Sequence, residues 1–507
     1  MTPREAELTE QLKQCRQALK EALARIALLE QKNDLLIRRF FGKSSEQLDP
    51  GQLDLFLAQV EVPASPTPQE PLPPLEKVQS SPRKSREPRL PEDLQVIEVF
   101  IDPEPVKAAP DQWRCIGEEV SEQLDFEPAQ FLRRRVIRRK YVSRQDEDRA
   151  PVIAELPACL QERGMAAPGL LAHVVVSKYC DHLPLYRQEQ IYQRRHGVYL
   201  PRQTLARWMD LAADWLQPVY DQIRVGVLAG GYVQVDETPI EYLDPGHGQT
   251  RQGYLWVCSQ PGGDVFFQWE TSRAAACLEK LIVVNFNGVL QCDGYAAYPS
   301  FVASRKGTIS QAGCWAHVRR PFHEALEQAP RTASWILRQL QHLYRIEARL
   351  REGKAGPRLR EAVRAHESRP IVARIKRAVT ALKASRRHLP QSTLGQAFDY
   401  TLGQWSTLEV YLGDGRVEID NNLVENAIRP TALGKKNWLF IGDAEAGDRG
   451  AILYTIVESC RRRGIDPYAY LRDVLTRLPR TTNHQVRKLT PAAWLADREH
   501  KPLRAAS

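Results

Sequence analysis

The segment Gly230-Gly-Tyr-Val-Gln-Val-Asp-Glu-Thr-Pro239 gives the first indication of how this 507-residue chain folds. Aromatic and β-branched residues between two glycines and Thr238-Pro239 predict a short buried strand over 232–236. Asp236 and Glu237 stand where that strand is expected to end. A carboxylate there costs free energy unless something pairs with it, and divalent cations bind carboxylate oxygens. Asp236 is therefore predicted to be either a turn cap or a metal ligand.

A second predicted strand, Gly288-Val-Leu-Gln-Cys-Asp293, also ends in an acid. The elements expected between the two are strands at 253–259 and 264–269 and a helix at 273–284. Three strands, a helix and a fourth strand follow the order of a ribonuclease-H-like α/β sheet, in which the first and fourth strands are neighbours. We therefore expect Asp236 and Asp293 to lie side by side.

A third acid follows a long helical insertion. Residues 322–412 are poor in glycine and have helical spacing, and the segment 419–430 then places Glu425 on a helix. Three converging carboxylates can hold two Mg²⁺ or Mn²⁺ ions, which activate a water or 3′-hydroxyl and stabilise the leaving oxygen at a phosphodiester. Two alternatives stay open. Asn422 and Glu425 have the spacing of a capping box, and Asp420 is a rival for either role.

The N-terminal part of the chain predicts an extended region before the sheet. Residues 4–41 contain two series of apolar residues at seven-residue spacing, with Asn33 at a seam position, which predicts a coiled-coil oligomerisation helix. The alternative is an amphipathic helix packed on its own domain. Residues 62–91 contain nine prolines and predict a semi-rigid linker.

A small β-rich module is expected at 92–150, with strands at 95–101 and 131–142. The second strand carries six basic residues. These residues indicate either a strip that follows DNA phosphates or an ordinary solvated strand face.

Residues 157–229 predict helices at 170–178, 185–194 and from 202 onward, with a turn at His196-Gly197. Two helices joined by a short glycine-containing turn resemble a helix-turn-helix. The side chains that would then face DNA are Arg202, Gln203, Thr204 and Arg207. Plain helical packing is the alternative. A C-terminal helical region is expected at 431–480, with helices at 450–463 and 467–478 and a loose tail beyond 480.

The totals exclude some classes of protein. No run of 18 apolar residues exists and no secretory signal is seen, so we expect a cytoplasmic protein that associates with the nucleoid when it binds DNA. Nine cysteines without a Cys-x-x-Cys pair indicate reduced thiols. A net charge of +9 permits nucleic-acid binding, and Lys435-Lys436 is one of the local basic clusters.

Several motifs, taken together and in order, resemble one family. They are Phe41-Gly-Lys-Ser-Ser-Glu46, Gly117-Glu-Glu-Val-Ser-Glu-Gln-Leu-Asp125, Val235-Asp-Glu-Thr238, Cys292-Asp-Gly-Tyr295, Cys314-Trp-Ala-His-Val-Arg-Arg320, Asp420-Asn-Asn-Leu-Val-Glu-Asn-Ala-Ile-Arg-Pro430, Lys436-Asn-Trp-Leu-Phe440 and Gly464-Ile-Asp-Pro-Tyr-Ala-Tyr-Leu471. This set is similar to the insertion-sequence-66 family of DDE transposases, over nearly the whole chain.

The resemblance implies a ribonuclease-H-like core at 230–430 with a helical insertion before its glutamate. It implies that Asp236, Asp293 and Glu425 are the catalytic, metal-binding acids. The implied reaction is cleavage of element 3′ ends and their joining to target DNA with Mg²⁺. Arg319 and Arg320 are then expected to contact DNA, and the element's own accessory proteins are expected as possible partners.

One departure from the family concerns zinc. Members usually carry a cysteine-rich, zinc-finger-like module near the Gly117–Asp125 motif, but this chain keeps only Cys115 and has Ser143 at a later cysteine position. Because a structural zinc site needs four nitrogen or sulfur ligands, we expect no zinc here. Two other functions stay open: a catalytically idle DNA-binding relic, and an RNA-directed nuclease on the same sheet.

Overall fold

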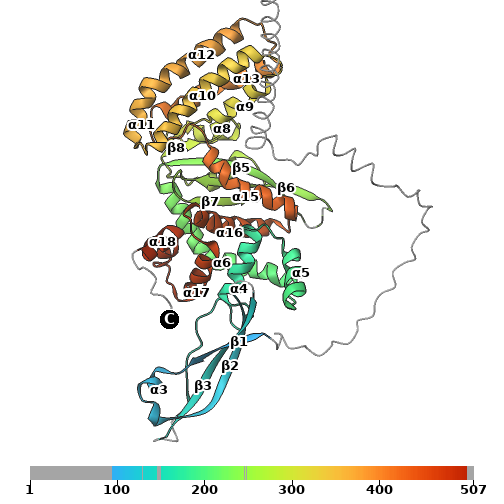
Figure 1. Ribbon diagram of the computed structural model, residues 1–507, viewed down its shortest axis with the longest axis vertical. Coiled ribbons are helices and arrows are strands. Elements are labelled where there is room, and N and C mark those ends of the chain that lie inside the picture. The colour runs from blue at the N-terminus through green and yellow to red at the C-terminus, as the bar shows by residue number, and fades with distance from the viewer. Residues whose placement is uncertain (1–93, 128–129, 145–149, 245, 247, 500–507) are drawn as a thin grey trace, which may run out of the picture. The chain divides into compact units, whose positions relative to one another are not determined.

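The computed structural model describes residues 94–127, 130–144, 150–244, 246 and 248–499 (Figure 1). The coiled coil expected at 4–41 and the linker at 62–91 lie outside these residues. The domain boundaries expected within the described part stay predictions. What the structure establishes is a mixed α/β architecture with two sheets and many helices.

The central sheet has the strand order β7-β6-β5-β8-β9, with β10 beside the far end of β5. Its strands are β5 Tyr232–Leu243, β6 Thr250–Ser259, β7 Val265–Glu270, β8 Gly288–Gln291, β9 Ile309–Ala312 and β10 Phe440–Ile441. Helix α7 (Ala275–Leu281) precedes β8, and α8 (Ala297–Ser304) precedes β9. The first and fourth strands, β5 and β8, pair in parallel. The prediction that they are neighbours is confirmed.

Strand β5 is longer than the sequence indicated. Thr238-Pro239 was expected to end it, yet it continues to Leu243, so Asp236 lies in the middle of the strand and not at its end. Proline cannot donate a hydrogen bond to a neighbouring strand. Pro239 is tolerated because its parallel neighbour β8 pairs with β5 only as far as Gln234, and β10 begins to pair at Glu241.

The expected helical insertion is present between β9 and α15 (Asn422–Trp438). Its helices are α9 Trp315–Glu324, α10 Pro330–Glu352, α11 Pro357–Val363, α12 Arg369–Ala384, α13 Thr393–Gly403 and α14 Trp405–Leu408. Their apolar side chains form a second core that continues into the sheet at Tyr232 and Val289. The chain enters and leaves at one place, because the Trp315 amide donates to the Ile419 carbonyl (3.2 Å).

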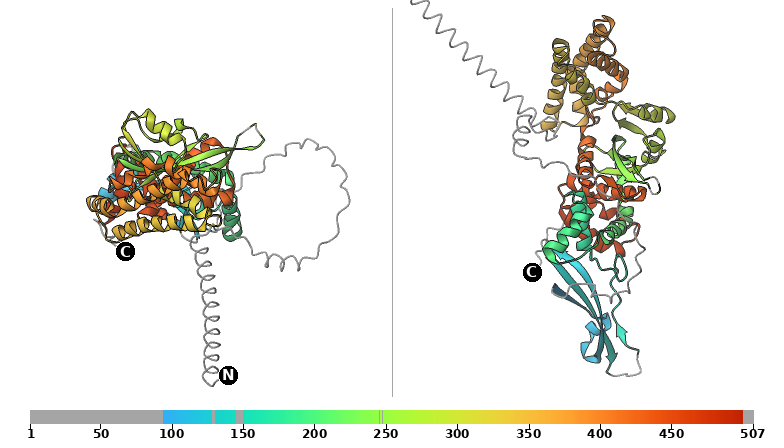
Figure 2. Two further views of the ribbon diagram at one scale, coloured as in Figure 1. Left: turned by 90° about the horizontal axis from the view of Figure 1, so that it is seen from above. Right: turned by 90° about the vertical axis from the view of Figure 1, so that its right-hand side faces the viewer.

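A group of helices lies beside strand β7 of the sheet, and its members come from the sequence before and after the sheet. Helices α4 (Pro168–Tyr179), α5 (Leu185–His196) and α6 (Arg202–Ala229) precede it, and α16 (Ala444–Arg462) and α17 (Pro467–Arg477) follow. Helices α6 and α16 pack against β7 and against each other, away from the edge where the insertion joins (Figures 1 and 2). Gly197, with φ of 67°, ends α5 in the left-handed conformation, as the His196-Gly197 turn predicted.

The expectation of a loose tail beyond residue 480 is wrong for residues 481–499, the part of the tail that the structure describes. Helix α18 (Pro491–Glu499) packs back onto the fold, and the indole Nε1 of Trp494 donates to Asp473 (2.8 Å). Val486 and Leu489 are also buried. The polar composition of this segment concealed its few well-spaced apolar anchors. Within the described residues, no helix is both long enough and apolar enough to cross a membrane.

The smaller sheet has the order β1-β3-β2. Strand β1 (Gln95–Ile101) was predicted with the same bounds, and β3 (Gln130–Ser143) was predicted within two residues. Strand β2 (Trp113–Glu127) was not predicted, because acidic residues obscure its alternation. A short helix α3 (Glu104–Ala108) precedes β2, and β4 (Val152–Ile153) pairs with β3.

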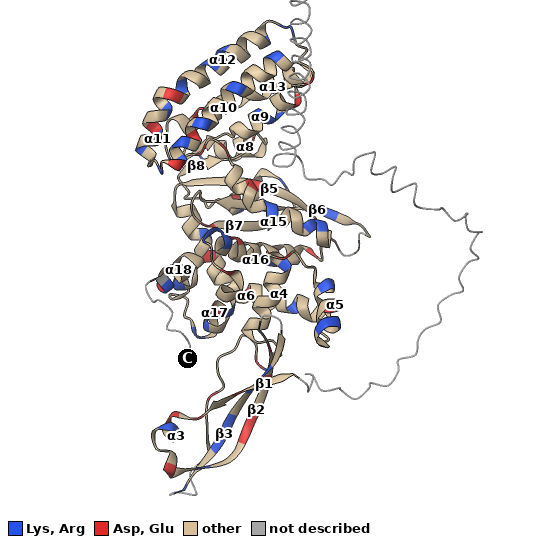
Figure 3. Ribbon diagram, viewed as in Figure 1, with Lys and Arg blue, Asp and Glu red and all other residues tan. Residues whose placement is uncertain are grey.

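Acidic residues of β2 lie beside the basic residues of β3 (Figure 3). Cross-strand ion pairs join Arg133 and Arg135 to Glu122 (both 3.0 Å), Arg138 to Glu119 (2.5 Å) and Arg139 to Glu118 (3.3 Å). Opposite charges on facing positions stabilise a strand pair. This pairing favours a charge ladder within the module over a strip that follows DNA phosphates.

A buried ion pair inside the insertion gives a test of this fold. Glu347 and Arg364 are both fully buried, and Arg364 donates to Glu347 at 2.7 and 2.8 Å. Removal of one partner leaves the other charge buried without a counter-charge. We expect Glu347→Gln to lower the free energy of unfolding by roughly 3–5 kcal/mol, measured by urea denaturation. The exposed Glu352→Gln on the same helix is the control; equal stabilities of the two variants would contradict the arrangement.

Candidate active site

Asp236 and Asp293 are brought together by the pairing of their strands. Gln234 of β5 pairs with Gln291 of β8, and each acid lies two residues further along its chain. Because strand side chains alternate between faces, Asp236 lies on the same side of β5 as Gln234, and Asp293 lies two residues beyond the end of β8 at Gln291. Both acids are partly buried, and Asp293 accepts a hydrogen bond from the Tyr295 amide (3.0 Å).

Gln234 and Gln291 form a buried hydrogen-bonded pair, which we call a clamp and which the sequence analysis missed. Both are fully buried, and the Gln234 amide nitrogen donates to the Gln291 side-chain oxygen (2.9 Å) and to the Asp420 carbonyl (2.9 Å). The Gln234 oxygen accepts from the Val424 amide (3.3 Å). Gln291 in turn donates to the Glu418 carbonyl (2.8 Å). The clamp therefore ties the segment that returns from the insertion to the strands that carry the two aspartates.

Tyr232 completes this clamp. Its hydroxyl donates to Gln291 (2.6 Å) and accepts from the Glu418 amide (2.9 Å). The only sequence signal for the clamp was a polar residue two places before each acid in otherwise apolar strands. We name Tyr232, Gln234 and Gln291 the glutamine clamp.

Glu425 stands directly after the clamped segment, in the first turn of α15. The capping-box alternative is wrong. The N-cap of this helix is Asn421 and not Asn422, and it makes no side-chain capping hydrogen bond among the described residues. Asp420 instead accepts from the Asn422 amide (3.2 Å) and side chain (2.9 Å). The carboxylate of Glu425 lies 3.7 Å from His317 Nε2. Asp420 therefore acts as the local cap, and Glu425 keeps its carboxylate for another role.

Glu237 is held away from this group. It accepts hydrogen bonds from Arg273 Nε (2.6 Å) and from the Tyr298 hydroxyl (2.6 Å). Its two oxygens are thus committed to side chains on the opposite side of β5. These contacts give Glu237 a structural role.

The electrostatics of the three acids fit a cation. Burial, and then the neighbouring Glu237, Glu425 and Asp293, raise the pKa of Asp236 well above its ordinary value of 3.8. Among the described residues, no Lys or Arg forms an ion pair with Asp236, Asp293 or Glu425. Carboxylates that repel one another without a counter-charge are the donor set that a hard divalent cation prefers.

The acids are near enough to influence one another's charge, but they do not yet enclose a site. In the described part of the chain, no three His, Cys, Asp or Glu side chains lie close enough together to hold a metal ion. The residues therefore fit such an ion by their chemistry, and the carboxylates would have to close around it.

The predicted DNA-contacting residues lie at several places on the surface. Arg202, Gln203 and Arg207 are exposed at the start of α6, with Thr204 partly buried beside them. Arg319 and Arg320 are exposed on α9, beyond His317. Lys436 is exposed, whereas Lys435 donates to the Pro239 carbonyl (3.0 Å) and so serves partly to hold α15 against β5.

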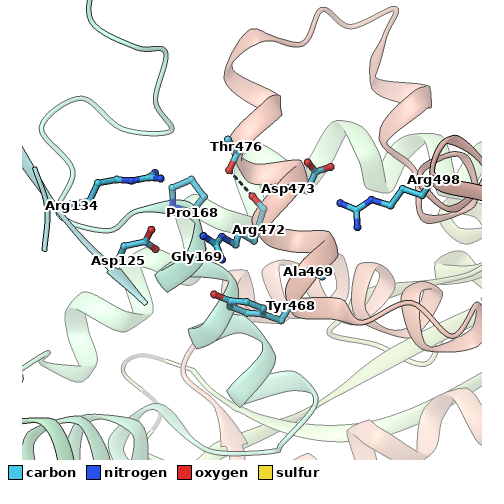
Figure 4. Close-up of a pocket in the computed structure, with 10 residues that line it drawn as sticks. All are labelled: Asp125, Arg134, Pro168, Gly169, Tyr468, Ala469, Arg472, Asp473, Thr476 and Arg498. Atoms are coloured by element: carbon cyan, nitrogen blue, oxygen red, sulfur yellow. Dashed lines mark hydrogen bonds between the residues drawn. The ribbon is translucent and has the colours of Figure 1, made fainter. Parts of the chain in front are cut away.

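A separate cavity of about 420 Å³ lies where the small sheet meets α4 and α17 (Figure 4). Its charged lining residues are Arg134, Arg472, Arg498, Asp125 and Asp473. None of the three predicted catalytic acids contributes to its lining. It is therefore distinct from the site at the glutamine clamp.

Comparison with known proteins identifies related chains. Residues 163–449 match the family model described as "Transposase IS66 family", residues 455–497 match "IS66 C-terminal element", and residues 28–99 match "Transposase C of IS166 homeodomain". The uncharacterized protein y4jD of Sinorhizobium fredii is 36% identical over 425 residues, covering 80% of this chain and 82% of the relative. The uncharacterized protein y4qI of the same organism is 37% identical over 403 residues, covering 76% and 73%.

Loss of the glutamine clamp should release the segment before Glu425. Gln234→Leu leaves the Asp420 carbonyl and the Val424 amide without their buried partner, at roughly 1–3 kcal/mol for each unsatisfied group. We expect faster hydrogen exchange of the amides at 418–425, measured by mass spectrometry. Gln268→Leu on β7 is the control, because the Gln268 side chain donates only to Glu270 of its own strand. Unchanged exchange at 418–425 in Gln234→Leu would argue against the clamp.

Neutralising Asp236 should stabilise the metal-free protein. Its pKa is raised in the folded state, so the folded chain binds the proton more tightly and loses stability as the pH rises above the ordinary value of 3.8. At neutral pH in EDTA we expect Asp236→Asn to raise the melting temperature by roughly 2–5 °C. The exposed Glu324→Gln on α9 should leave it unchanged. A lower melting temperature for Asp236→Asn would show that the aspartate is paired.

Proposed function

Since this chain belongs to the IS66 family of transposases, we propose that it is an active transposase of an insertion sequence. It binds the ends of its element, cleaves their 3′ ends and joins them to target DNA. The observation that carries this proposal is the clamp, which connects the strands of Asp236 and Asp293 to the segment that ends in Glu425. A protein that only binds DNA has no need to hold together three acids that, among the described residues, no Lys or Arg pairs with.

We assign the core at 230–430 to a ribonuclease-H-like fold. Support comes from the strand order β7-β6-β5-β8-β9, in which three antiparallel strands are followed by a parallel pair. The insertion between β9 and α15 separates the third acid from the first two in sequence but not in space.

The proposed mechanism gives a role to each of the three acids and to the residues that contact them. Asp236, Asp293 and Glu425 would hold Mg²⁺ or Mn²⁺, which supplies activation of the attacking water or 3′-hydroxyl and stabilisation of the leaving oxygen. Asp293 is oriented by the Tyr295 amide. His317 stands beside Glu425, where it can orient that carboxylate. Glu237 keeps Arg273 and Tyr298 in place on the other side of β5.

DNA is the expected partner, both as element ends and as target. The exposed Arg202, Gln203 and Arg207 remain candidates for reading the element ends, and Arg319 and Arg320 for phosphate contacts near the acids. Self-association through residues 4–41 would hold two ends together, and accessory proteins of the same element are further candidates. The module at 92–150 is proposed to hold without zinc.

Substitution of the acids tests the proposal. We expect Asp236→Asn, Asp293→Asn and Glu425→Gln each to reduce Mg²⁺-dependent cleavage of element-end DNA by roughly a thousandfold or more, because each removes a group needed in the transition state. DNA affinity in EDTA should stay within about threefold, since the acids do not contact DNA without metal and phosphate contacts dominate affinity. The readouts are a strand-cleavage assay and fluorescence anisotropy.

Two controls make the test specific. Glu324→Gln removes an exposed acid from α9 and should retain activity. Asp420→Asn tests the rival acid: full loss of cleavage there, with activity retained in Glu425→Gln, would transfer the third role to Asp420. A wild-type protein that binds end DNA but cannot cleave it would identify a catalytically idle relic.

A further inference from the structure

The net positive charge of this chain is concentrated in one part of the fold. Helices α10 to α13, residues 330–403, contain sixteen Lys or Arg and five Asp or Glu, a formal net charge of +11. The whole chain has a net charge of +9, so everything outside these helices is slightly acidic. We call α10 to α13 the insertion helices. Figure 3 shows blue segments along α10, α11 and α12, with few red ones.

Most of these cations have no carboxylate partner within the described part of the chain. Carboxylates pair with Arg349, Arg351, Arg360, Arg364 and Lys383. The other eleven Lys and Arg of the insertion helices form no ion pair among the described residues. The acids present thus neutralise a minority of the cations, and two of these, Arg360 and Arg364, lie inside the helical core. An excess of unpaired, solvated cations is the surface that a polyanion binds.

Three of the unpaired arginines follow a line along α10. Arg331, Arg338 and Arg345 are seven residues apart and all exposed, so they lie on one face of the helix over about 21 Å. The opposite face is the core face, where Ile336 and Leu340 are fully buried. Neighbouring arginines of this line are about 10.5 Å apart along the helix axis, so the line can reach phosphates that are spread along a duplex.

The insertion helices are fixed to the catalytic strands. Arg360 of α11 donates to the Glu418 carboxylate (2.8 Å), and the Glu418 backbone is held by Gln291 and Tyr232 of the glutamine clamp. The shared apolar core continues from α10 and α12 to Tyr232. A duplex bound on the insertion helices would therefore keep a set position relative to the three acids.

We propose that the exposed face of the insertion helices, centred on Arg331, Arg338 and Arg345, is a sequence-independent binding surface for the phosphodiester backbone of duplex DNA. The proposal rests on the transposase function above and names one of its DNA contacts. The duplex that binds there is either the DNA flanking the element or the target DNA, because both have the same phosphodiester backbone.

The test uses the full chain with Arg331, Arg338 and Arg345 all changed to glutamine. Glutamine keeps helix propensity, and the side chains are exposed, so the fold should be preserved, as checked by circular dichroism and melting temperature. The control changes Arg480, Arg487 and Lys488 to glutamine, which removes the same charge from exposed positions outside the insertion helices. Binding is measured in EDTA, so that it does not depend on cleavage.

We expect the insertion variant to bind an unrelated duplex about tenfold more weakly, or weaker still. The slope of log affinity against log salt should fall by about 2–3, near 0.9 for each phosphate that the protein no longer neutralises. The control should change affinity by less than about threefold. An equal reduction with end-bearing and unrelated duplexes supports backbone binding of either source, and a reduction confined to the unrelated duplex assigns the surface to target DNA.

Three outcomes would overturn the inference: an unchanged salt slope in the folded insertion variant, an equal reduction in the control, or a reduction seen with single-stranded RNA but not with duplex DNA. Failure of the proposed catalytic function is seen separately, in the cleavage assay. A wild-type chain that binds duplex through the insertion helices yet never cleaves would keep this surface and reject the transposase reaction.

Discussion

The arrangement of the candidate site depends on a hydrogen bond between two buried amides. Gln234 and Gln291 face each other across the parallel pair of β5 and β8, and neither can be solvated once the sheet has formed. Their remaining hydrogen-bonding groups need partners, because a buried unsatisfied amide is costly. The segment around Asp420 and Glu418 supplies them. The requirement to satisfy two amides thus determines where the chain returns from the insertion, and hence where Glu425 lies.

This explains why the sequence revealed some of the site and not the rest. The neighbouring positions of Asp236 and Asp293 could be predicted, because apolar strand patterns and strand order depend on local composition. The glutamine clamp could not, since its partners in the returning segment are backbone groups more than 100 residues away in sequence. The capping-box interpretation of Glu425 was wrong for a related reason. Asp420, two residues before the helix begins, accepts from its first amide, and spacing alone does not distinguish the two acids.

Other predictions of secondary structure were wrong because neighbouring residues in the fold change what a residue type normally indicates. Pro239 normally marks the end of a strand, but here no donor is required at its position in β5. The acidic residues of β2 hid that strand from the sequence analysis. They are compatible with a strand because they face basic residues of β3, and this match is seen only when the two strands are paired. Trp494 anchors a segment whose composition is otherwise polar. In each case the missing information was the partner.

The entry and exit of the insertion are joined by a hydrogen bond between Trp315 and Ile419. Because its two ends lie together, the whole insertion connects to the sheet in the same way as a short loop would. Such modules can be lengthened, shortened or exchanged during evolution without altering the strands beneath them. A chain of this type could acquire a new mode of holding its substrate by replacing one continuous stretch of sequence, while the chemistry of the sheet is inherited unchanged.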